Sequence, residues 1–399
     1  MPWDILVMVT NYVWDGRPDA KRQPPHYLAS AWASQLSQPV LVVNLIPWSA
    51  LLRRPTSWWR FRPGLHRSST PGLWVLNLLG PEWREASHAG ARLPIERVEA
   101  KIRHALRSLG LHAPLLVASE PAHCRLFAKF AETLNVWYCT DDFGADDAER
   151  TPSIRDNEAW ALAHADLVVT VSAELRDALS PKAKKTVWLP NGVDAEELRS
   201  LAATSGPVSG WQEMARPRIA FLGSVDNRVA YGPLLDCVQQ HPTKSFLLIG
   251  SVYEHDKTIE EHVRKLRALP NVHFLGMRNR REIAWILSQC DAGLIPYEVN
   301  EFNRACSPLK VFEYAALGLP VIAAALPALR EYGQVIGLID MANLADTLDF
   351  HLEVGPTRKD GLRAFADANT WSLRAKRLAA NLQEVARTRS QARVDNERV

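Results

Sequence analysis

Short apolar segments alternate with helix-like stretches along the whole chain, and this alternation limits the fold more than any other feature. Near the N-terminus, the pattern predicts an apolar strand at 3–9, a helix at 26–36 and a second strand at 39–44. A strand, a helix and a strand in this order form a βαβ unit, whose two strands are parallel. Ligands of such sheets bind beyond the carboxyl ends of the strands, so the loop 10–25 is expected at a binding edge.

The same alternation continues and then repeats in the second half of the chain. The predicted elements are strands at 73–76, 114–118, 136–139, 165–172, 186–189, 218–222, 245–249, 272–275, 291–297 and 321–323, with helices at 95–109, 122–134, 234–240, 282–289 and 309–317. Between the halves, the stretch 202–217 contains Ser, Gly and Pro and little periodicity, which places a domain boundary between Leu198 and Arg216. We therefore predict an α/β protein of two doubly wound domains with a cleft between them.

Length and composition agree with this prediction. A chain of 399 residues with 47% apolar and 23% charged residues is typical of a globular protein of two domains. No apolar run approaches the ~18 residues of a membrane span, and no signal peptide begins the sequence, so a cytoplasmic location is expected. The five cysteines are scattered without a C-x-x-C pair, which argues against a zinc site or a disulfide framework.

The stretch 303–323 combines a turn, a short helix and a strand. Ser307 and Pro308 suit the N-cap and first position of a helix from Leu309 to Leu317, which Gly318 would end. The N-terminus of such a helix attracts phosphate through free backbone N–H groups and a partial positive charge. Lys310 and Glu313 would share one face, with Lys310 suited to the phosphates of a nucleotide and Glu313 to its ribose hydroxyls. The alternative is a solvated pair of charges on a surface helix.

Other residues of the second half are expected at the same ligand edge. Gly223 follows a predicted strand and lets a ligand approach the backbone closely, while Arg228 is suited to a phosphate. Gly250 ends the next strand, and Tyr297 ends the strand that leads into 303–323. We assign all four to donor binding together with Ser307, Pro308, Leu309, Lys310 and Glu313.

Two features of the first half are candidates for acceptor chemistry. Asp141 and Asp142 directly follow the strand at 136–139, where parallel sheets place substrates. Crowded carboxylates raise the pKa of one partner, which can then act as a general base. The alternative is that one Asp caps the following segment and the other is solvated. His26 at a helix start is a candidate for acceptor contact, although a half-exposed, helix-capping histidine is equally compatible with the sequence.

The stretch 46–71 mixes tryptophan with arginine. No Asp or Glu occurs between Ala20 and Pro81, whereas seven basic residues do: Lys21, Arg22, Arg53, Arg54, Arg60, Arg62 and Arg67. Nucleic acid, an anionic membrane surface and an acidic partner all suit such a mixture, but no nucleic-acid-binding motif accompanies it. Trp48, Trp58 and Trp59 beside arginines favour contact with an anionic membrane, and a loop packed on its own domain is the alternative.

The ordered series FLGS, LLIGS, VHFLG, CDAGLIPY and SPLKVFEYAALGLPVIA resembles the nucleotide-sugar half of the GT-B glycosyltransferases, and LVVTVSAEL…LPNGVD resembles the segment that enters their interdomain linker. The resemblance implies two Rossmann-like domains, an acceptor domain at 1–198 and a donor domain at 199–369. It also implies that a C-terminal segment, 370–399, returns to the first domain through a helix.

A finer resemblance is to the xanthan glucuronosyltransferase type. Retaining relatives carry Glu-x7-Glu, but Ala305 stands eight residues before Glu313. The resemblance therefore implies an inverting, metal-independent transferase without a cofactor, with Asp142 as the base and Asp141 as the second candidate. It implies a nucleotide-diphosphate sugar such as a UDP-sugar as donor, a lipid-linked saccharide acceptor in exopolysaccharide synthesis, and work at the inner face of the membrane. The alternatives are an epimerase or phosphorylase of the same fold and a non-catalytic nucleotide-sugar-binding protein.

Overall fold

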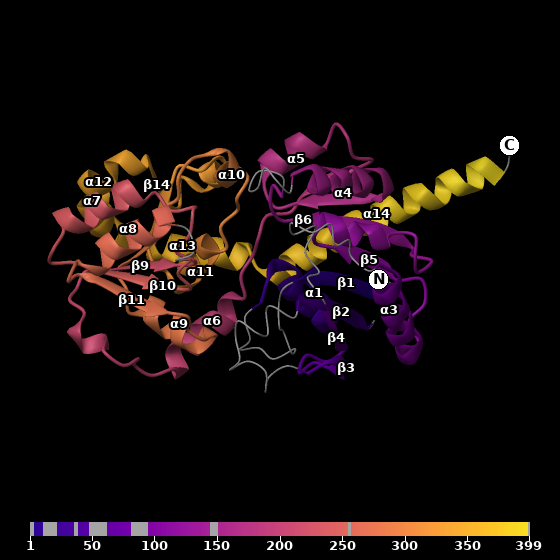
Figure 1. Cartoon of the computed structure of the whole chain (residues 1–399), viewed down its shortest axis with the longest axis horizontal. Helices are drawn as coiled ribbons and strands as arrows, with labels where there is room; N and C mark the ends of the chain where they lie inside the picture. The colour runs from indigo at the N-terminus through magenta and orange to yellow at the C-terminus, as the bar shows by residue number, and fades with distance from the viewer. Residues whose placement is uncertain are drawn as a thin grey trace. The chain divides into compact units, whose positions relative to one another are not determined.

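The computed structural model describes residues 4–10, 22–35, 39–47, 62–80, 95–143, 151–253 and 257–397. The chain forms two compact units (Figure 1). The first contains Met1–Pro190 and Trp371–Val399, and the second contains Asn191–Thr370.

The first unit is built on an eight-stranded sheet of order β3-β4-β2-β1-β5-β6-β7-β8. Its strands are β1 (Ile5–Thr10), β2 (Val40–Pro47), β3 (Gly64–Arg67), β4 (Leu73–Gly80), β5 (Leu115–Ala118), β6 (Leu134–Cys139), β7 (Leu167–Thr170) and β8 (Thr186–Trp188). All pairs are parallel except β3 with β4, and Val7 of β1 is in register with Val42 and Val117. The predicted parallel sheet is confirmed. The edge strand β3 was not predicted and lies within the basic stretch 46–71.

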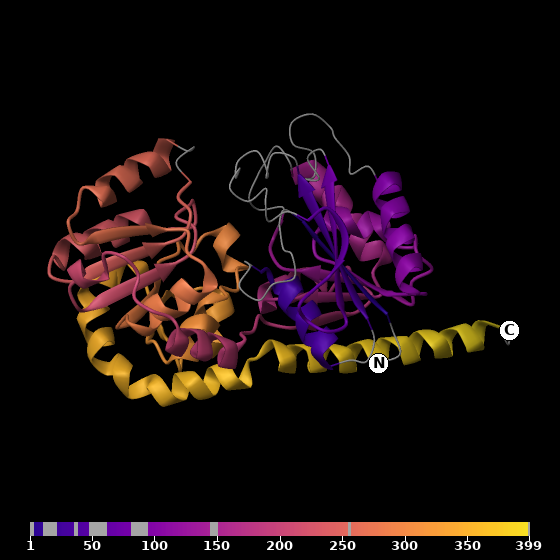
Figure 2. The same cartoon turned by 90° about the horizontal axis from the view of Figure 1, so that it is seen from below.

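The helices of the first unit are α1 (Pro24–Gln35), α3 (Ile95–Leu109), the 3-10 helix η2 (Pro121–Leu126), α4 (Thr151–His164), α5 (Ala173–Leu179) and α14 (Trp371–Glu397). The terminal helix α14 packs along α1 (Figure 2). The indole of Trp32 donates to the carbonyl of Ala375 at 3.2 Å, and the rings of Tyr27 and Trp371 stack 5.4 Å apart. The C-terminal helix therefore belongs to the first unit, as the family resemblance implies.

The helix predicted at 122–134 is wrong. Only the short η2 forms, and Ala128 and Ala131 beyond it adopt positive φ angles of 64° and 53°. The carboxylate of Glu132 accepts the backbone N–H groups of Lys129 and Phe130 at 3.0 and 3.1 Å, where a helix would supply carbonyl oxygens. A side chain that bonds to its own backbone in this way stabilises a turn at the expense of a helix.

The second unit is built on a six-stranded, wholly parallel sheet of order β11-β10-β9-β12-β13-β14. Its strands are β9 (Arg218–Leu222), β10 (Ser245–Ile249), β11 (Val272–Gly276), β12 (Ala292–Ile295), β13 (Val321–Ala324) and β14 (Gly337–Ile339). The strand order reverses between β9 and β12, and open α/β sheets bind ligands beyond the strand ends at such a switch point.

Helices cover both faces of this sheet. They are α6 (Ala195–Thr204), α7 (Tyr231–Gln240), α8 (Lys257–Arg267), α9 (Arg280–Ser288), α10 (Glu301–Arg304), α11 (Lys310–Leu317), α12 (Leu344–Val354) and α13 (Lys359–Ala368), with short 3-10 turns η3 (Trp211–Glu213), η4 (Pro327–Tyr332), η5 (Met341–Asn343) and η6 (Gly355–Arg358). The helices α7, α8 and α12 group together, and α6, α9, α11 and α13 form the other group (Figure 1).

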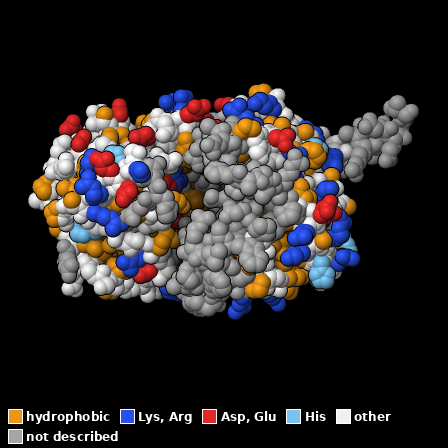
Figure 3. All heavy atoms as spheres, viewed as in Figure 1, with side chains coloured by type: hydrophobic (Ala, Val, Ile, Leu, Met, Phe, Trp, Pro, Cys, Tyr) orange, Lys and Arg blue, Asp and Glu red, His pale blue; other side chains and the backbone are white. Residues whose placement is uncertain are grey.

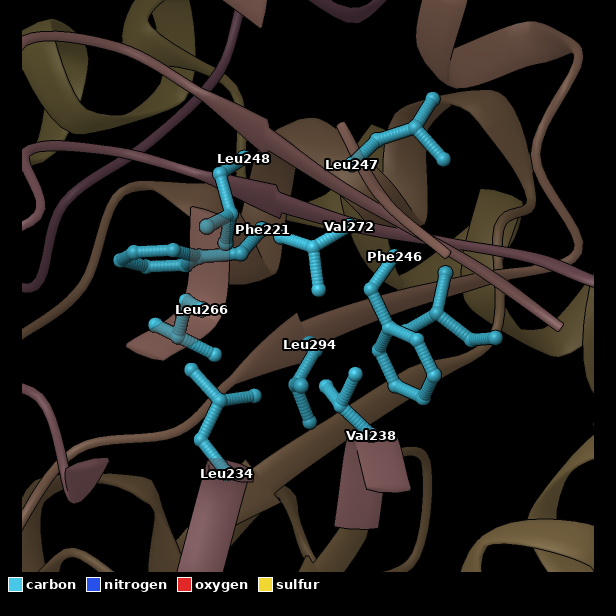
Figure 4. A pocket seen from close by; sticks show the side chains of 10 residues that line it. Phe221, Leu234, Val238, Phe246, Leu247, Leu248, Leu266, Val272 and Leu294 are labelled. Atoms are coloured by element: carbon cyan, nitrogen blue, oxygen red, sulfur yellow. The ribbon is translucent and has the colours of Figure 1, made fainter. Parts of the chain in front are cut away.

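The core of the second unit lies on both faces of the sheet, and one part of it lies between the sheet and the helices α7 and α8. Figure 4 shows apolar side chains from the sheet and these helices, among them Phe221, Leu234, Leu266 and Leu294, around a space of about 10 Å³. A space of this volume is no larger than a single water needs, and it has no polar lining to bind one. We regard it as a packing gap in the core and not as a ligand site.

The boundary predicted between Leu198 and Arg216 needs correction, because the second unit begins at Asn191. The helix α6 packs against α9 and α11. Arg199 of α6 donates to the carbonyl of Ala316 at 2.8 Å and forms an ion pair with Asp367, also at 2.8 Å. These contacts tie the segment before the Ser/Gly/Pro-containing stretch to the second unit, so that stretch is an internal loop.

Candidate active site

The carboxyl edge of the second sheet brings together the loops after β9, β10 and β12 and the N-terminus of α11. Gly223 follows β9, and a Cβ atom on it would lie 2.7 Å from Cε and 2.8 Å from Nζ of Lys310. Any larger residue at position 223 would therefore displace the lysine side chain. The sequence predicted that both residues belong to one site, and the structure places them in contact.

Gly250 has a packing role that the sequence did not predict, and its contact with the donor stays a prediction. A Cβ atom on Gly250 would lie 2.0 Å from the carbonyl oxygen of Gly223. Because glycine has no Cβ atom, the loop after β10 can pack against the loop after β9. The hydroxyls of Ser224 and Ser251, 3.2 Å apart, join the same loops. Gly250 thus shapes the floor of the site through the loop that carries Gly223.

Lys310 is oriented by aromatic side chains. Its ammonium group donates to the hydroxyl of Tyr297 and lies 4.9 Å from the centroid of that ring and 5.9 Å from that of Phe221. Tyr297 is fully buried. The prediction that Tyr297 contacts the donor is therefore replaced by a positioning role, because its hydroxyl holds the ammonium group that faces the site.

The N-terminus of α11 offers donors for an anion. Within the part of the chain that the structure describes, the backbone N–H groups of Leu309 and Lys310 have no acceptor. Free N–H groups at the first turn of a helix attract phosphate. The predicted N-cap is wrong, however, since the helix begins at Lys310 and its N-cap is Leu309 without a side-chain bond. Ser307 instead offers its carbonyl to the side chain of Asn191 at 2.8 Å.

Glu313 is held by an arginine that the sequence analysis did not single out. Nη1 of Arg280 lies 3.6 Å from Oε1 of Glu313, and Nη2 lies 3.0 Å from Oε2 of Glu197. Burial raises the pKa of Glu313, while the charges of Arg280 and Lys310 oppose that rise. Among the described residues, Lys310 contacts Tyr297 and Glu313 contacts Arg280. Lys310 and Glu313 therefore do not form a solvated pair of charges with each other, which was the alternative to a nucleotide site. The signal for Arg280 was the basic run at 278–281.

Arg228 is already engaged. Its Nε donates to Oδ1 of Asp226 at 3.0 Å, and its guanidinium lies 5.5 Å from the centroid of the Tyr297 ring. The phosphate contact that the sequence suggested would have to be shared with Asp226. It stays a prediction.

In the first unit, Asp141 and Asp142 directly follow β6, as predicted; Asp141 is exposed and Asp142 half-buried. A third carboxylate, Glu158 of α4, was missed. Burial and the charge of Asp142 raise the pKa of Glu158, and Lys182 and Arg155 act in the opposite direction. A carboxylate of a different element therefore raises the pKa of Glu158, whereas the predicted crowding was between Asp141 and Asp142. The helix α4 carries no sequence signal that marks Glu158 for this position.

His26 is buried and cannot reach an acceptor directly. Its Nδ1 accepts the backbone N–H of Gln23 at 3.0 Å, and its Nε2 donates to Oδ1 of Asn44, also at 3.0 Å. Asn44 in turn donates to Asn77 at 2.8 Å. Burial lowers the pKa of His26 to about 4, so the ring is neutral at physiological pH. The prediction of acceptor contact is therefore wrong. The alternative is right about the contact with the start of α1 and wrong about exposure, because the ring is fully buried and not half-exposed.

The neutral, buried His26 predicts a loss of stability in acid. Because its pKa falls from 6.5 to about 4 on folding, its contribution is complete above pH 6.5 and declines as the pH falls toward 4. We expect the drop in unfolding free energy between pH 7 and pH 5, measured with urea, to be roughly 2 kcal/mol smaller in His26→Gln than in the parent. His104→Gln, at an exposed position of α3, is the matched control. Equal drops in parent and His26→Gln would contradict a neutral buried ring.

The profile of the family described as Glycosyl transferases group 1 matches residues 216–350, which include β9 to β14 and the N-terminus of α11. The second unit is a group 1 glycosyltransferase domain. The match covers the loops that carry Gly223, Tyr297 and Lys310. The sheet edge described above therefore lies within the matched residues.

A curated relative supports the same assignment. A Bacillus subtilis protein named as a teichuronic acid biosynthesis glycosyltransferase, TuaH, is 30% identical over 111 residues, which are 28% of this chain and 27% of that protein. This chain thus matches only about a quarter of the length of that relative.

Solved structures extend the comparison to the whole chain. Sucrose-phosphate synthase from Thermosynechococcus elongatus superposes with a TM-score of 0.71 at 18% identity, covering 96% of this chain and 99% of that one. Anabaena HepE in complex with UDP superposes with a TM-score of 0.61 at 14% identity, covering 95% of this chain and all of that one (100%). The glycosyltransferase domain and the first unit together form the GT-B fold, which confirms the predicted fold class.

Proposed function

We propose that the protein is a glycosyltransferase that transfers a sugar from a nucleoside diphosphate sugar, with UDP as the nucleotide, to a saccharide acceptor. The observation that carries the proposal is the ammonium group of Lys310 beside Gly223, next to backbone N–H groups without an acceptor in the described residues. A cation and a helix N-terminus at the switch point of a parallel sheet suit a diphosphate. The UDP bound to HepE and the group 1 domain at 216–350 support the choice of ligand.

The chemistry we propose is an inverting displacement. A carboxylate of the first unit, Asp142 or Asp141, takes the proton of an acceptor hydroxyl, whose oxygen then forms a bond to the anomeric carbon of the donor. The bond from that carbon to the diphosphate breaks, and the diphosphate leaves with the electron pair. Lys310 and the N-terminus of α11 offset the charge that develops on the leaving group, so this step requires no metal.

Donor binding is the first test. We expect a UDP-sugar to raise the temperature of thermal unfolding, because a ligand that binds the folded state alone stabilises it. At a ligand concentration of 100 times Kd, the gain is about 2.7 kcal/mol. A panel of UDP-, GDP- and ADP-sugars, each compared with the free sugar as a control, identifies the nucleotide. If no nucleotide sugar of the panel shifts the unfolding temperature, the proposed function is contradicted.

A product assay with and without an added acceptor or phosphate separates the alternatives once a donor is known. An epimerase changes the nucleotide sugar without an acceptor, and a phosphorylase needs phosphate. A transferase releases the nucleotide and extends the added saccharide. A scaffold protein binds the donor and shows no turnover with any of these additions.

We further propose a lipid-linked acceptor in exopolysaccharide or cell-surface glycan synthesis and a site of action at the inner face of the membrane. TuaH, named for teichuronic acid biosynthesis, and the basic, tryptophan-containing stretch 46–71 support this part. Residues 48–61 of the stretch lie outside the described residues. Among the described helices, none has the length and apolar character that crossing a bilayer requires. On the face in Figure 3, basic and acidic side chains are interspersed over the coloured part of the second unit.

A membrane contact predicts binding to anionic vesicles that weakens with salt. Each basic residue near an anionic leaflet is worth ~1 kcal/mol, and tryptophan adds attraction that salt does not screen. Replacing Arg53, Arg54, Arg60 and Arg62 by Ser should release the protein in a sedimentation assay and leave donor binding unchanged. A matched control replaces the exposed Arg97, Lys101, Arg107 and Lys129, which removes the same charge elsewhere on the first unit. Equal sedimentation of both variants and the parent would leave 46–71 as an ordinary packed stretch.

A further inference from the structure

A cavity of about 390 Å³ opens on the second unit, at the edge of the sheet opposite to Lys310. Its lining includes the residues directly before three strands: Pro217 before β9, Asp291 before β12 and Pro320 before β13. The C-terminal ends of α9 and α11 and the first residue of α13 complete it. Cavities that bind small molecules have volumes of roughly 300–1,000 Å³, so this space is large enough for one.

The lining is apolar at its base. Half of the twelve lining residues are leucine or proline: Leu287, Leu317, Leu319, Leu352, Pro217 and Pro320. The thiol of Cys290 also lies here, and its Sγ donates a hydrogen bond to the carbonyl of Ile286 at an S···O distance of 3.2 Å. This base is suited to an apolar body such as a short hydrocarbon chain or an aromatic ring.

The charges of the lining are unequal. Asp291 is its one acidic residue, and both of its oxygens are occupied. Oδ1 accepts a hydrogen bond from the guanidinium of Arg216, and Oδ2 accepts the backbone N–H of Arg218 at 2.7 Å. The negative charge of Asp291 is therefore offset within the protein, and it does not repel an incoming anion.

Two cations converge beside the cavity. A Cβ atom on Gly318 would lie 2.6 Å from Cγ of Lys359 and 3.1 Å from Nε of Arg363, so both side chains cross this glycine. Gly318 ends α11 with a φ of +70°, a conformation that favours glycine. Neither Lys359 nor Arg363 has an acidic partner among the residues that the structure describes. Lys359 lines the cavity itself.

We propose that this cavity is a second ligand site, separate from the donor edge, for a compact anionic amphiphile. The ligand would place a carboxylate, sulfonate or phosphate group against Lys359 and an apolar body against Leu287, Leu319 and Leu352. Burial of the apolar body stabilises the complex, and the pairing of the anion with the ammonium group fixes its orientation.

The test uses the fluorescence of 8-anilinonaphthalene-1-sulfonate, an anionic aromatic probe, with the full chain. Lys359→Glu is expected to weaken binding of the probe on the order of tenfold or more, because attraction becomes repulsion. Ser288→Trp, at an exposed position of the lining, should also abolish binding by filling the space. The matched control is Lys265→Glu, an exposed lysine of α8 away from the cavity, which should bind the probe as the parent does. Each variant is first shown to unfold at the temperature of the parent.

Competition then tests the head group. Hexyl phosphate should displace the probe from the parent at a concentration at least tenfold lower than hexanol, which has the same chain without the charge. The proposal is overturned if the parent does not bind the probe, or if Lys359→Glu and Ser288→Trp both bind it like the parent. Equal displacement by hexanol and hexyl phosphate would overturn the anionic class. None of these results depends on the identity of the sugar donor.

Discussion

Replacing Asp142 with Asn is expected to lower the turnover number by at least about 100-fold while the affinity for the nucleotide sugar stays close to that of the parent. General-base catalysis contributes roughly 10²–10⁴-fold, and Asn cannot take up the acceptor proton. Asp142 lies at the end of β6 in the first unit, whereas Lys310 and Gly223 belong to the second. Initial rates with saturating donor give the turnover number, and calorimetry gives the donor affinity.

Two further variants locate the base within the acidic cluster. Asp141→Asn is the closest control, because it removes the same charge one residue earlier. Glu158→Gln removes the carboxylate whose pKa is raised by burial and by Asp142. A loss confined to Asp141→Asn or to Glu158→Gln would assign the base to that residue. Full turnover in all three would exclude a base in this cluster and with it the inverting mechanism proposed here.

Lys310→Ala is expected to weaken UDP binding about 10- to 150-fold. A hydrogen bond to a charged group contributes roughly 1.5–3 kcal/mol, and the lysine lies where the diphosphate would meet the N-terminus of α11. Calorimetry with UDP and with uridine separates the contacts, since uridine lacks the diphosphate. The loss should appear with UDP and be nearly absent with uridine. Loss of equal size with both ligands would show that the substitution disturbs the site in general.

Tyr297→Phe and Glu313→Gln separate the contributions of the other two side chains to ligand binding at the same site. Tyr297→Phe keeps the ring and removes the hydroxyl that holds the ammonium group, so it should reproduce part of the Lys310→Ala effect. Glu313→Gln should weaken UDP and uridine alike, because its proposed partner is the ribose. Unchanged affinity for both ligands in Lys310→Ala and Glu313→Gln would mean that the donor binds elsewhere.

The sequence predicted the features that depend on local patterns. Apolar segments at the right spacing predicted the parallel sheets, and the helix ending at Gly318 formed as expected. Lys310 and Gly223 were correctly assigned to one edge, because parallel strands end on the same side of their sheet. The GT-B fold was predicted from a family resemblance. That resemblance depends on the order of several segments, because no single motif among them is specific.

One failure, the helix predicted at 122–134, has the local cause described above, and the others depend on contacts between distant parts of the chain. His26 looked accessible at a helix start, but Asn44 lies beside it only once β2 has paired with β1. Ser307 is a residue type that favours an N-cap, but its side chain does not cap α11. Its carbonyl instead accepts a hydrogen bond from the side chain of Asn191, more than a hundred residues earlier. Glu158 and Arg280 owe their roles to neighbours that no local pattern identifies.

The division of the first unit into two segments affects how the protein folds during synthesis. Trp371, Ala375, Leu378 and Leu382 of α14 are buried in a unit whose other residues all precede Asn191. A ribosome adds ~5–20 residues per second, so roughly 10–40 s pass between the completion of Pro190 and that of Leu382. During this interval Trp32 and Tyr27 lack the helix that covers them. The second unit is one continuous segment, Asn191–Thr370, and it can fold before α14 is complete. The nascent first unit therefore waits with an exposed apolar stripe on α1, which is the kind of surface that chaperones bind.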